Sequence, residues 1–128
     1  ATVLATIPAS GGWVTSPELT RYPTDDPDLA VLDVVGELDL TNAFDFEEQL
    51  ADLTAGRSKL VLDLNRVYFI DSAGLHVLFR LARRLGRSRF GIVLDPSASI
   101  ARTLAVASVP DVATLRGSVE DTLAALEA

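Results

Sequence analysis

The most constraining feature of this sequence is an apolar segment that passes, within a few residues, into an amphipathic helical pattern. Residues 60–64 are short, apolar and bounded by polar residues, which is typical of a strand buried on both faces of a sheet. The helical pattern that follows places apolar side chains on one face and polar ones on the other: Leu75, Leu78, Phe79, Ala82 and Leu85 against His76, Arg80, Arg83, Arg84 and Arg87. A buried strand followed by an amphipathic helix is the building unit of an α/β fold.

Residues 69–75 join the two patterns, and we expect them to form a turn that delivers Ser72 to a helix N-terminus. The first backbone N–H groups of a helix have no intrahelical partner and carry the positive end of its dipole, so they accommodate a hydroxyl or a phosphate. Either Asp71 or Ser72 can supply the cap, and the small Ala73 and Gly74 leave room for another molecule to approach. The same residues also fit a simpler interpretation, in which Asp-Ser is only an N-cap pair.

The remaining patterns extend this unit to a whole domain. Strands are expected at residues 18–22, 29–35, 90–94 and 112–115, and helices from Thr41 or Asn42, at residues 97–107 and after Ser118. The first two strands read as an antiparallel hairpin, whereas the later strands alternate with helices and need crossover connections. We therefore predict a single α/β domain with a mixed, mostly parallel sheet, an N-terminal β-hairpin and about four helices packed against it. The domain is expected to span residues 18–128, after an N-terminal extension at residues 1–17 whose one large side chain, Trp13, is expected to pack onto the domain.

Composition argues against several classes of protein. A chain of 128 residues that is 48% apolar can build one domain with a real core. It has no cysteine and one histidine, so we expect no thiolate or histidine-built metal site and no disulfide. The net charge of −7 disfavours nucleic acid or an anionic membrane as the main partner. Without an apolar run of membrane-spanning length or a signal peptide, we expect a soluble, cytoplasmic protein with no membrane insertion.

Charge is unevenly distributed along the chain. Acidic residues gather at residues 25–33, 37–52 and 120–127, whereas arginines gather at residues 80–89. A basic helix face on an acidic protein suits an acidic protein surface, although charged faces also occur merely to keep a surface solvated.

No catalytic motif is complete. Gly11 and Gly12 are not followed by the lysine and hydroxyl of a phosphate-binding loop, and no dinucleotide fingerprint occurs. Ser72 and His76 are four apart on one helix, where Cβ atoms lie about 5–6 Å apart without facing one another, and no Gly-x-Ser-x-Gly elbow surrounds Ser72. We therefore expect neither a hydrolytic triad with Asp71 nor any other enzyme activity, and no cofactor.

Three motifs at their mutual distances resemble the STAS domain of bacterial anti-sigma factor antagonists, over residues 19–128. The resemblance is carried by Gly36-Glu37-Leu38-Asp39 with Thr41 and Ala43 at a helix start, by Phe69-Ile70-Asp71-Ser72-Ala73-Gly74-Leu75, and by Leu94-Asp95-Pro96-Ser97. In that family the serine after the aspartate is the phosphoacceptor, which is Ser72 here, and the aspartate of the first motif, near the phosphoserine and involved in partner binding, corresponds to Asp39. From turn chemistry alone, Asp39 reads equally well as a loop aspartate that bonds its own backbone.

The resemblance implies partner switching in the regulation of transcription, as in sporulation and general stress responses. An unphosphorylated antagonist binds an anti-sigma factor that is also a serine kinase and so frees a sigma factor; phosphorylation of Ser72 abolishes binding, and a serine phosphatase restores it. The partner-binding residues expected on this basis are Glu37, Asp39, Thr41, Asp71, Ser72, Ala73, Gly74, His76 and Arg80. The alternative is a non-switching scaffold or accessory subunit of a stress-sensing or transport complex. A small nucleotide binder is a third possibility, with no phosphate-binding loop to support it.

Overall fold

The computed structural model describes residues 17–126, so the expected packing of Trp13 concerns residues outside the described range. The elements in chain order are β1 (Glu18–Tyr22), β2 (Leu29–Leu38), α1 (Ala43–Leu53), β3 (Lys59–Ile70), α2 (Ser72–Leu85), β4 (Phe90–Val93), α3 (Ala101–Val106), a 3₁₀ turn η1 (Val109–Asp111), β5 (Thr114–Arg116) and α4 (Val119–Ala125). The predicted order of strands and helices is confirmed.

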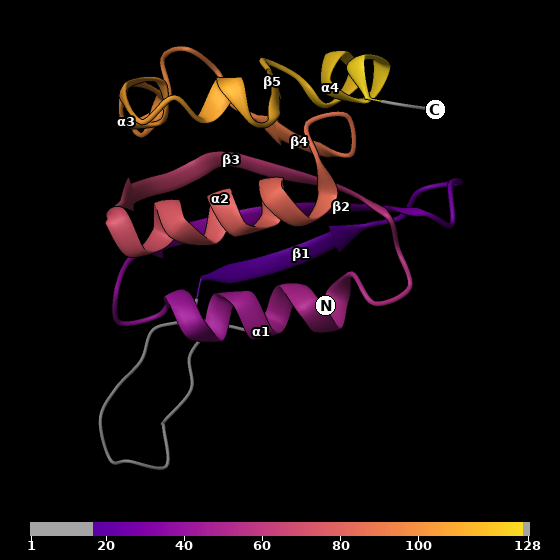
Figure 1. Ribbon diagram of the computed structural model, residues 1–128, viewed down its shortest axis with the longest axis horizontal. Coiled ribbons are helices and arrows are strands. Elements are labelled where there is room, and N and C mark those ends of the chain that lie inside the picture. The colour runs from indigo at the N-terminus through magenta and orange to yellow at the C-terminus, as the bar shows by residue number, and fades with distance from the viewer. Residues whose placement is uncertain (1–16, 127–128) are drawn as a thin grey trace.

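The five strands form one sheet in the order β1-β2-β3-β4-β5. β1 pairs antiparallel with β2, and every later pair is parallel. This is the predicted mixed sheet with an N-terminal hairpin, because each parallel neighbour is reached by a crossover over a face of the sheet. α1 and α2 lie side by side across one face (Figure 1).

The core divides between the two faces of the sheet, as the alternation of β2 and β3 requires. Leu32, Leu62 and Ile92 belong to the large core beneath α1 and α2, whereas Val31 and Val61 belong to a smaller core that Val119 and Leu126 help to cover. The second core depends on α4 lying close to β4: a Cβ at Gly91 would stand 2.5 Å from Cγ2 of the buried Thr122. The central strands are therefore buried on both faces, as predicted.

β3 is longer than predicted, because it pairs with β2 up to the contact of Leu38 with Ile70. The apolar run at residues 60–64 is interrupted by Asp63 and followed by Asn65. Both residues alternate with Val61 on the face of the sheet that α4 covers only in part. Polar residues on an open face do not end a strand, so residues 69–70, expected in a turn, are strand.

The third helix is shorter than predicted, since residues 97–100 form turns and α3 begins at Ala101. Asp95 explains why the helix begins later in the sequence than predicted. Its Oδ1 accepts hydrogen bonds from the backbone N–H and the hydroxyl of Ser97, at 2.8 and 2.7 Å. Such a side-chain turn competes with helical hydrogen bonding. The Ser97 bonds also hold the pKa of the Asp95 carboxyl below its ordinary value.

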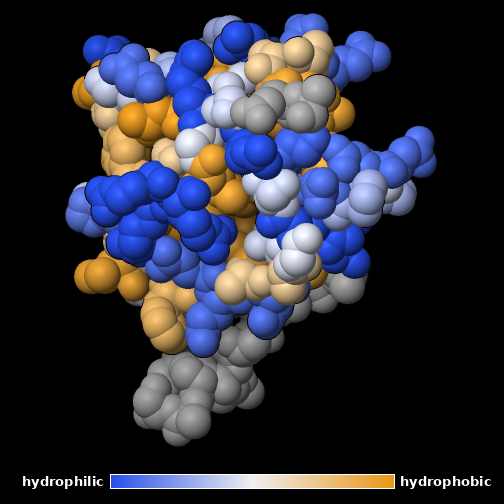
Figure 2. All heavy atoms as spheres, turned by 45° about the vertical axis from the view of Figure 1, so that its right-hand side comes forward, coloured by the Kyte–Doolittle hydropathy of each residue, from blue (hydrophilic) through white to orange (hydrophobic). Residues whose placement is uncertain are grey.

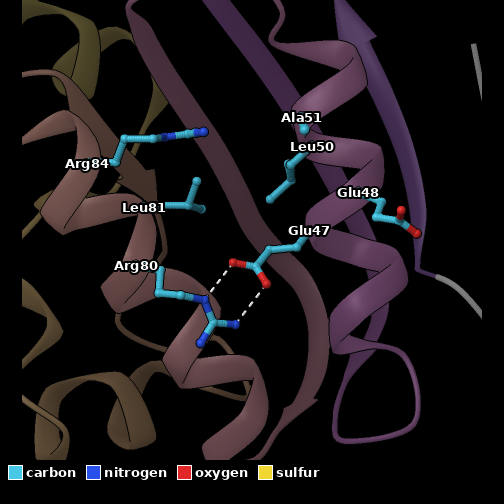
Figure 3. A pocket seen from close by; sticks show the side chains of 7 residues that line it. All are labelled: Glu47, Glu48, Leu50, Ala51, Arg80, Leu81 and Arg84. Atoms are coloured by element: carbon cyan, nitrogen blue, oxygen red, sulfur yellow. Dashed lines mark hydrogen bonds and ion pairs between the residues drawn. The ribbon is translucent and has the colours of Figure 1, made fainter.

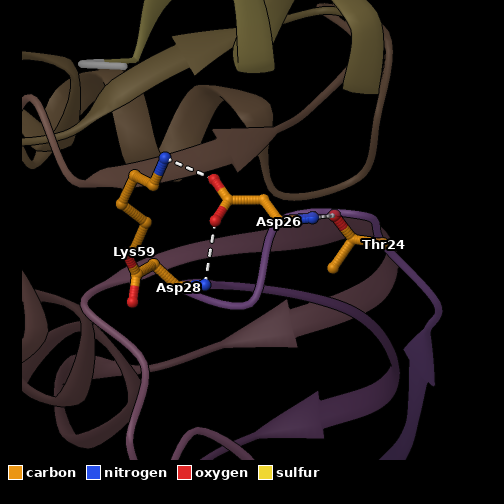
Figure 4. Close-up of polar contacts among 4 residues, drawn as sticks. All are labelled: Thr24, Asp26, Asp28 and Lys59. Atoms are coloured by element: carbon orange, nitrogen blue, oxygen red, sulfur yellow. Dashed lines mark hydrogen bonds and ion pairs between the residues drawn. The ribbon is translucent and has the colours of Figure 1, made fainter.

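The loop between β1 and β2 is tied to the start of β3 (Figure 4). Asp26 accepts a hydrogen bond from Nζ of Lys59 at 2.6 Å and one from the backbone N–H of Asp28 at 2.8 Å. Both bonds favour the charged carboxylate, the Lys59 bond more strongly, and lower the pKa of Asp26. This anchor holds the hairpin in register with the parallel part of the sheet.

Candidate functional site

Two loops meet at one edge of the sheet, because β2 and β3 are parallel neighbours and both lead into helices there. The β2–α1 loop carries Asp39, and Asp71 connects β3 to Ser72 at the start of α2. The backbone N–H of Asp71 donates to the carbonyl of Leu38 at 3.1 Å, which continues the strand pairing into the turn. The segments that carry Asp39 and Ser72 therefore share one edge of the sheet.

The Asp71 carboxylate joins the two loops. Its Oδ1 accepts the backbone N–H groups of Ala73 and Gly74, at 2.9 and 3.1 Å, and its Oδ2 accepts that of Leu40 at 3.0 Å. Asp71, and not Ser72, is therefore the N-cap of α2.

Ser72 stands exposed as the first residue of α2. Within the described residues its hydroxyl makes no hydrogen bond, either to His76 or to any other group. The first-turn amides of Ala73 and Gly74, which the sequence offered to a hydroxyl or phosphate, are occupied by Asp71. A group attached to the Ser72 oxygen would therefore face outward from the helix end.

Gly74 does not leave room for another molecule, contrary to the expectation. The residue is buried, and a Cβ there would lie 2.7 Å from both the carbonyl oxygen of Leu38 and Cγ1 of Ile70. The space beside Gly74 is filled by the chain itself. Its role is to let the first turn of α2 pack directly on the ends of β2 and β3.

Asp39 orders its own loop. Its Oδ1 accepts the backbone N–H of Thr41 at 3.0 Å and the Thr41 hydroxyl at 2.5 Å, and its carbonyl accepts the N–H groups of Asn42 and Ala43. The interpretation of Asp39 as a turn aspartate is therefore confirmed; a role in partner binding would come in addition to it.

Asn42 is an organising residue that the sequence reasoning considered only as a cap. It occupies the N-cap position of α1, but its side chain makes no capping bond. The side chain turns back instead: Oδ1 accepts the N–H of Asp39 at 3.0 Å, and Nδ2 donates to the carbonyl of Glu37 at 2.8 Å. Only 3% of Asn42 is exposed, so these bonds hold the loop from inside.

Exposed apolar side chains surround this edge, which the sequence reasoning missed. Leu40 is 80% exposed, Phe44 72% and Phe69 48%. The helical spacing of α1 could have predicted the exposure of Phe44, because this residue lies off the buried face formed by Ala43, Phe46 and Leu50. Grouped apolar exposure of this kind marks interaction surfaces.

Arg80 lies away from the turn and has a partner of its own. Its guanidinium donates two hydrogen bonds to Glu47 of α1, from Nε at 2.7 Å and from Nη2 at 2.8 Å, across a hollow between α1 and α2 (Figure 3). These bonds lower the pKa of the Glu47 carboxyl and raise that of Arg80. Eight residues of helix separate Arg80 from Ser72, about 12 Å along the axis.

The structure thus brings most of the expected residues to one sheet edge and leaves two apart. Asp39, Thr41 and Asp71 belong to the two joined loops, Glu37 lies near the end of β2, and Ser72 and Ala73 begin α2, with His76 exposed one turn further along the helix. Gly74 lies beneath the surface, and Arg80 is in the hollow between α1 and α2. Within residues 17–126, no group of three or more histidine, aspartate or glutamate side chains is placed to hold a metal ion. The helices of this part are also too short or too polar to cross a membrane.

Comparisons with known proteins agree with this architecture. The STAS domain model matches residues 20–122. The anti-sigma-F factor antagonist RsfB of Mycobacterium tuberculosis is 36% identical over 77 residues, 59% of this chain and 63% of RsfB, so the match spans less than two thirds of that relative.

Two solved structures show the same fold. An anti-sigma factor antagonist from Mycobacterium paratuberculosis superposes with a TM-score of 0.69 at 28% identity, covering 84% of this chain and 93% of the other. The Bacillus cell fate determinant SpoIIAA, in its phosphorylated form, superposes with a TM-score of 0.56 at 16% identity, covering 83% of this chain and 96% of the other. By the extent of the family match and the shared fold, the chain belongs to the STAS domain family.

Proposed function

We propose that this chain is an anti-sigma factor antagonist whose binding to an anti-sigma factor with serine kinase activity is switched off by phosphorylation of Ser72. The docking surface consists of the β2–α1 loop, the β3–α2 turn and the adjoining start of α2, with Gly74 shaping the turn and Arg80 at the rim. A serine phosphatase would return the protein to its binding form. The naming of its relatives RsfB and the M. paratuberculosis protein as antagonists supports the general role.

One observation carries this proposal: the exposed Ser72 hydroxyl stands without a hydrogen bond beside a carboxylate that ties both loops together. A kinase needs an accessible hydroxyl, and a binding surface needs loops held in one arrangement. The pair Asp71 and Ser72 meets both needs, because the aspartate caps the helix and thereby leaves the serine uncommitted.

The same geometry suggests how phosphorylation would act. A phosphate adds about −1.5 to −2 charges at neutral pH. Because Asp71 occupies the amides of Ala73 and Gly74, the phosphate would project into the docking surface, beside exposed Leu40 and Phe44. A partner covering these apolar side chains would then have to desolvate a dianion, which opposes binding without any change of fold.

The direct test is phosphorylation of the full chain by candidate anti-sigma factor kinases with ATP, followed by intact-mass and peptide mass spectrometry. The wild type should gain one phosphate that maps to Ser72. Ser72→Ala should gain none, whereas Ser99→Ala, which removes another exposed serine, should behave as the wild type. Binding supplies the second readout: Ser72→Ala should bind the kinase, and Ser72→Glu should not.

Equal binding by Ser72→Glu and Ser72→Ala would exclude control through this site. Binding without phosphorylation by any candidate kinase would instead favour the scaffold or accessory-subunit role, with Ser72 reduced to a helix position beside the cap.

A further inference from the structure

The arginines of α2 and of the segment directly after it divide between two sides of the helix, and within residues 17–126 an ion pair forms on only one of these sides. Arg80 is paired with Glu47, and Arg84 lines the same hollow and helps to lower the pKa of Glu47. Arg83 and Arg87 lie on the other side, and within residues 17–126 neither forms an ion pair. Figure 2 shows one face of the molecule, on which hydrophilic and hydrophobic side chains lie next to one another.

These two arginines flank an apolar hollow of about 420 Å³ between α2 and the segment after η1. It is lined by Phe79, Ala82, Arg83, Arg87 and Val112. Arg87 is held in place by a hydrogen bond from its Nε to the carbonyl of Pro110 at 3.3 Å. The hollow therefore combines an apolar floor with two cations at its edge.

A second hollow of about 320 Å³ continues along the same side of α2 towards its N-terminus. It is lined by Leu75, Arg102, Thr103, Val106 and Ala107, and Val106 is 77% exposed. Leu75 and Phe79 are four residues apart on one helix face, so the two hollows adjoin. We call both together the α2–α3 groove.

The charge of this groove is opposite to that of the chain as a whole. Arginine is the only charged residue type lining either hollow, although the chain carries a net charge of −7. Asp111 is the neighbouring carboxylate in sequence, but it is exposed on η1 and lines neither hollow. Three cations around an apolar floor suit a ligand with apolar side chains on one face and carboxylates along its edges.

We propose that the α2–α3 groove binds an acidic, amphipathic segment of a partner protein. From Leu75 to the end of α2 at Leu85 the helix rises about 15 Å, which matches a partner helix of about 10 residues lying along α2. Nucleic acid fits less well, because its phosphates leave the apolar floor uncovered and the chain's net charge repels it. An anionic membrane meets the same repulsion.

The site is separate from the docking surface of the proposed function. Arg83 is 11 residues along α2 from Ser72, about 16 Å away along the axis, and Arg87 lies beyond the end of the helix at Leu85. The groove is also lined by residues of α3 and by Val112 after η1, whereas the segments that carry Asp39 and Ser72 meet at the ends of β2 and β3. Binding in the groove and phosphorylation control at Ser72 can therefore be tested independently of one another.

The test is fluorescence polarisation of the full chain with a labelled 14-residue peptide that places leucines at helical spacing on one face and glutamates on the other. The wild type should bind it, more weakly as ionic strength rises. Arg83→Glu combined with Arg87→Glu should weaken binding at least about tenfold, because both edge charges are reversed. Arg116→Glu, a reversal of an exposed arginine outside the groove, should leave affinity within about twofold, as should Ser72→Glu.

Substitutions in the peptide test the charged and the apolar contacts separately, and they leave the fold of the protein unchanged. Glutamine in place of glutamate, or serine in place of leucine, should each reduce affinity at least about tenfold. If the double arginine variant is unfolded by circular dichroism, Val106→Glu serves instead, since that side chain is exposed. Amide shifts in NMR titrations should map to residues 75–87 and 102–112.

Three outcomes would overturn the proposal. If the glutamine peptide bound as tightly as the glutamate peptide, charge would not be involved. If neither the double arginine variant nor Val106→Glu lost affinity for the peptide, the groove would not be involved. Shifts confined to residues 39–44 and 70–74 would assign the peptide to the other surface. Tighter, variant-sensitive binding of a 12-base-pair DNA duplex or of phosphatidylserine vesicles would replace the protein partner by one of those ligands.

Discussion

The backbone N–H of Leu40 donates a hydrogen bond to Oδ2 of Asp71 at 3.0 Å, across 31 positions of sequence. The other oxygen of the same carboxylate caps α2. One side chain therefore fixes both the start of the helix that presents Ser72 and the loop that presents Leu40. Any change at Asp71 alters the candidate docking surface on both of its sides.

Replacing Asp71 should separate these two roles. Asp71→Ala removes a cap worth about 0.5–2 kcal/mol and a further hydrogen bond worth about 0.5–1.5 kcal/mol, so a total loss of roughly 1–3 kcal/mol is expected in urea unfolding. Asp71→Ser, with one oxygen in place of two, should retain most of the cap while the Leu40 amide exchanges faster with solvent. Ser72→Ala is the control and should change stability by less than about 0.5 kcal/mol. An unchanged Leu40 exchange rate in Asp71→Ala would refute the tie between the loops.

Gly74→Ala should destabilise the protein although it lies in a helix. Alanine normally favours a helix interior over glycine by about 1 kcal/mol. Here its Cβ would stand 2.7 Å from the Leu38 carbonyl and from Ile70, and such overpacking costs about 1–3 kcal/mol. Gly117→Ala is the matched control, because nothing lies within 4 Å of a Cβ there. A stabilised Gly74→Ala protein would mean that the start of α2 shifts away from β2 without cost.

The Glu47–Arg80 pair should make stability depend on pH in the acid range. Because the pKa of Glu47 is lower in the folded protein, its contribution is complete above the pKa of an unfolded glutamate and disappears as pH falls through the folded value. The difference in unfolding free energy between wild type and Glu47→Gln should therefore be constant near neutral pH and shrink as the pH falls below about 5. A double-mutant cycle with Arg80→Gln should give a coupling of about 0.5–1 kcal/mol at neutral pH, since the pair is partly exposed.

Glu48→Gln is the control for this pair, because Glu48 points away from Arg80 (Figure 3). Its stability profile against pH should run parallel to that of the wild type. A constant difference between wild type and Glu47→Gln across the acid range would show that the ion pair contributes nothing to folding.

Leu40→Ser and Phe44→Ser should weaken partner binding without weakening the fold. Both side chains are largely exposed, so unfolding free energies should change by less than about 0.5 kcal/mol. If these side chains anchor the anti-sigma factor, each change should lower its affinity about tenfold in isothermal titration calorimetry. Leu123→Ser, an exposed apolar change on α4, should leave the affinity unaltered. Normal affinity in both loop variants would remove the apolar side chains from the docking surface.

The sequence by itself determined the types and order of the elements. Helical spacing in α2 and apolar runs in β3 and β4 are local patterns, and each follows from the geometry of its own element. The meeting of the two loops followed as well, because parallel neighbouring strands end at the same edge. The sequence also predicted a helix beginning after Ser118. The hydroxyl oxygen of Ser118 caps this helix by accepting the backbone N–H of Asp121 at 3.1 Å.

Only the tertiary structure decided how the site is built. The extension of β3 to Ile70 depends on its pairing with β2, and the burial of Gly74 depends on where Leu38 ends. The bond from Leu40 to Asp71 spans 31 positions, and the Arg80–Glu47 pair spans 33. Contacts at such separations arise from the packing of whole elements, and the local periodicities of the sequence, which repeat over two to four residues, carry no record of them.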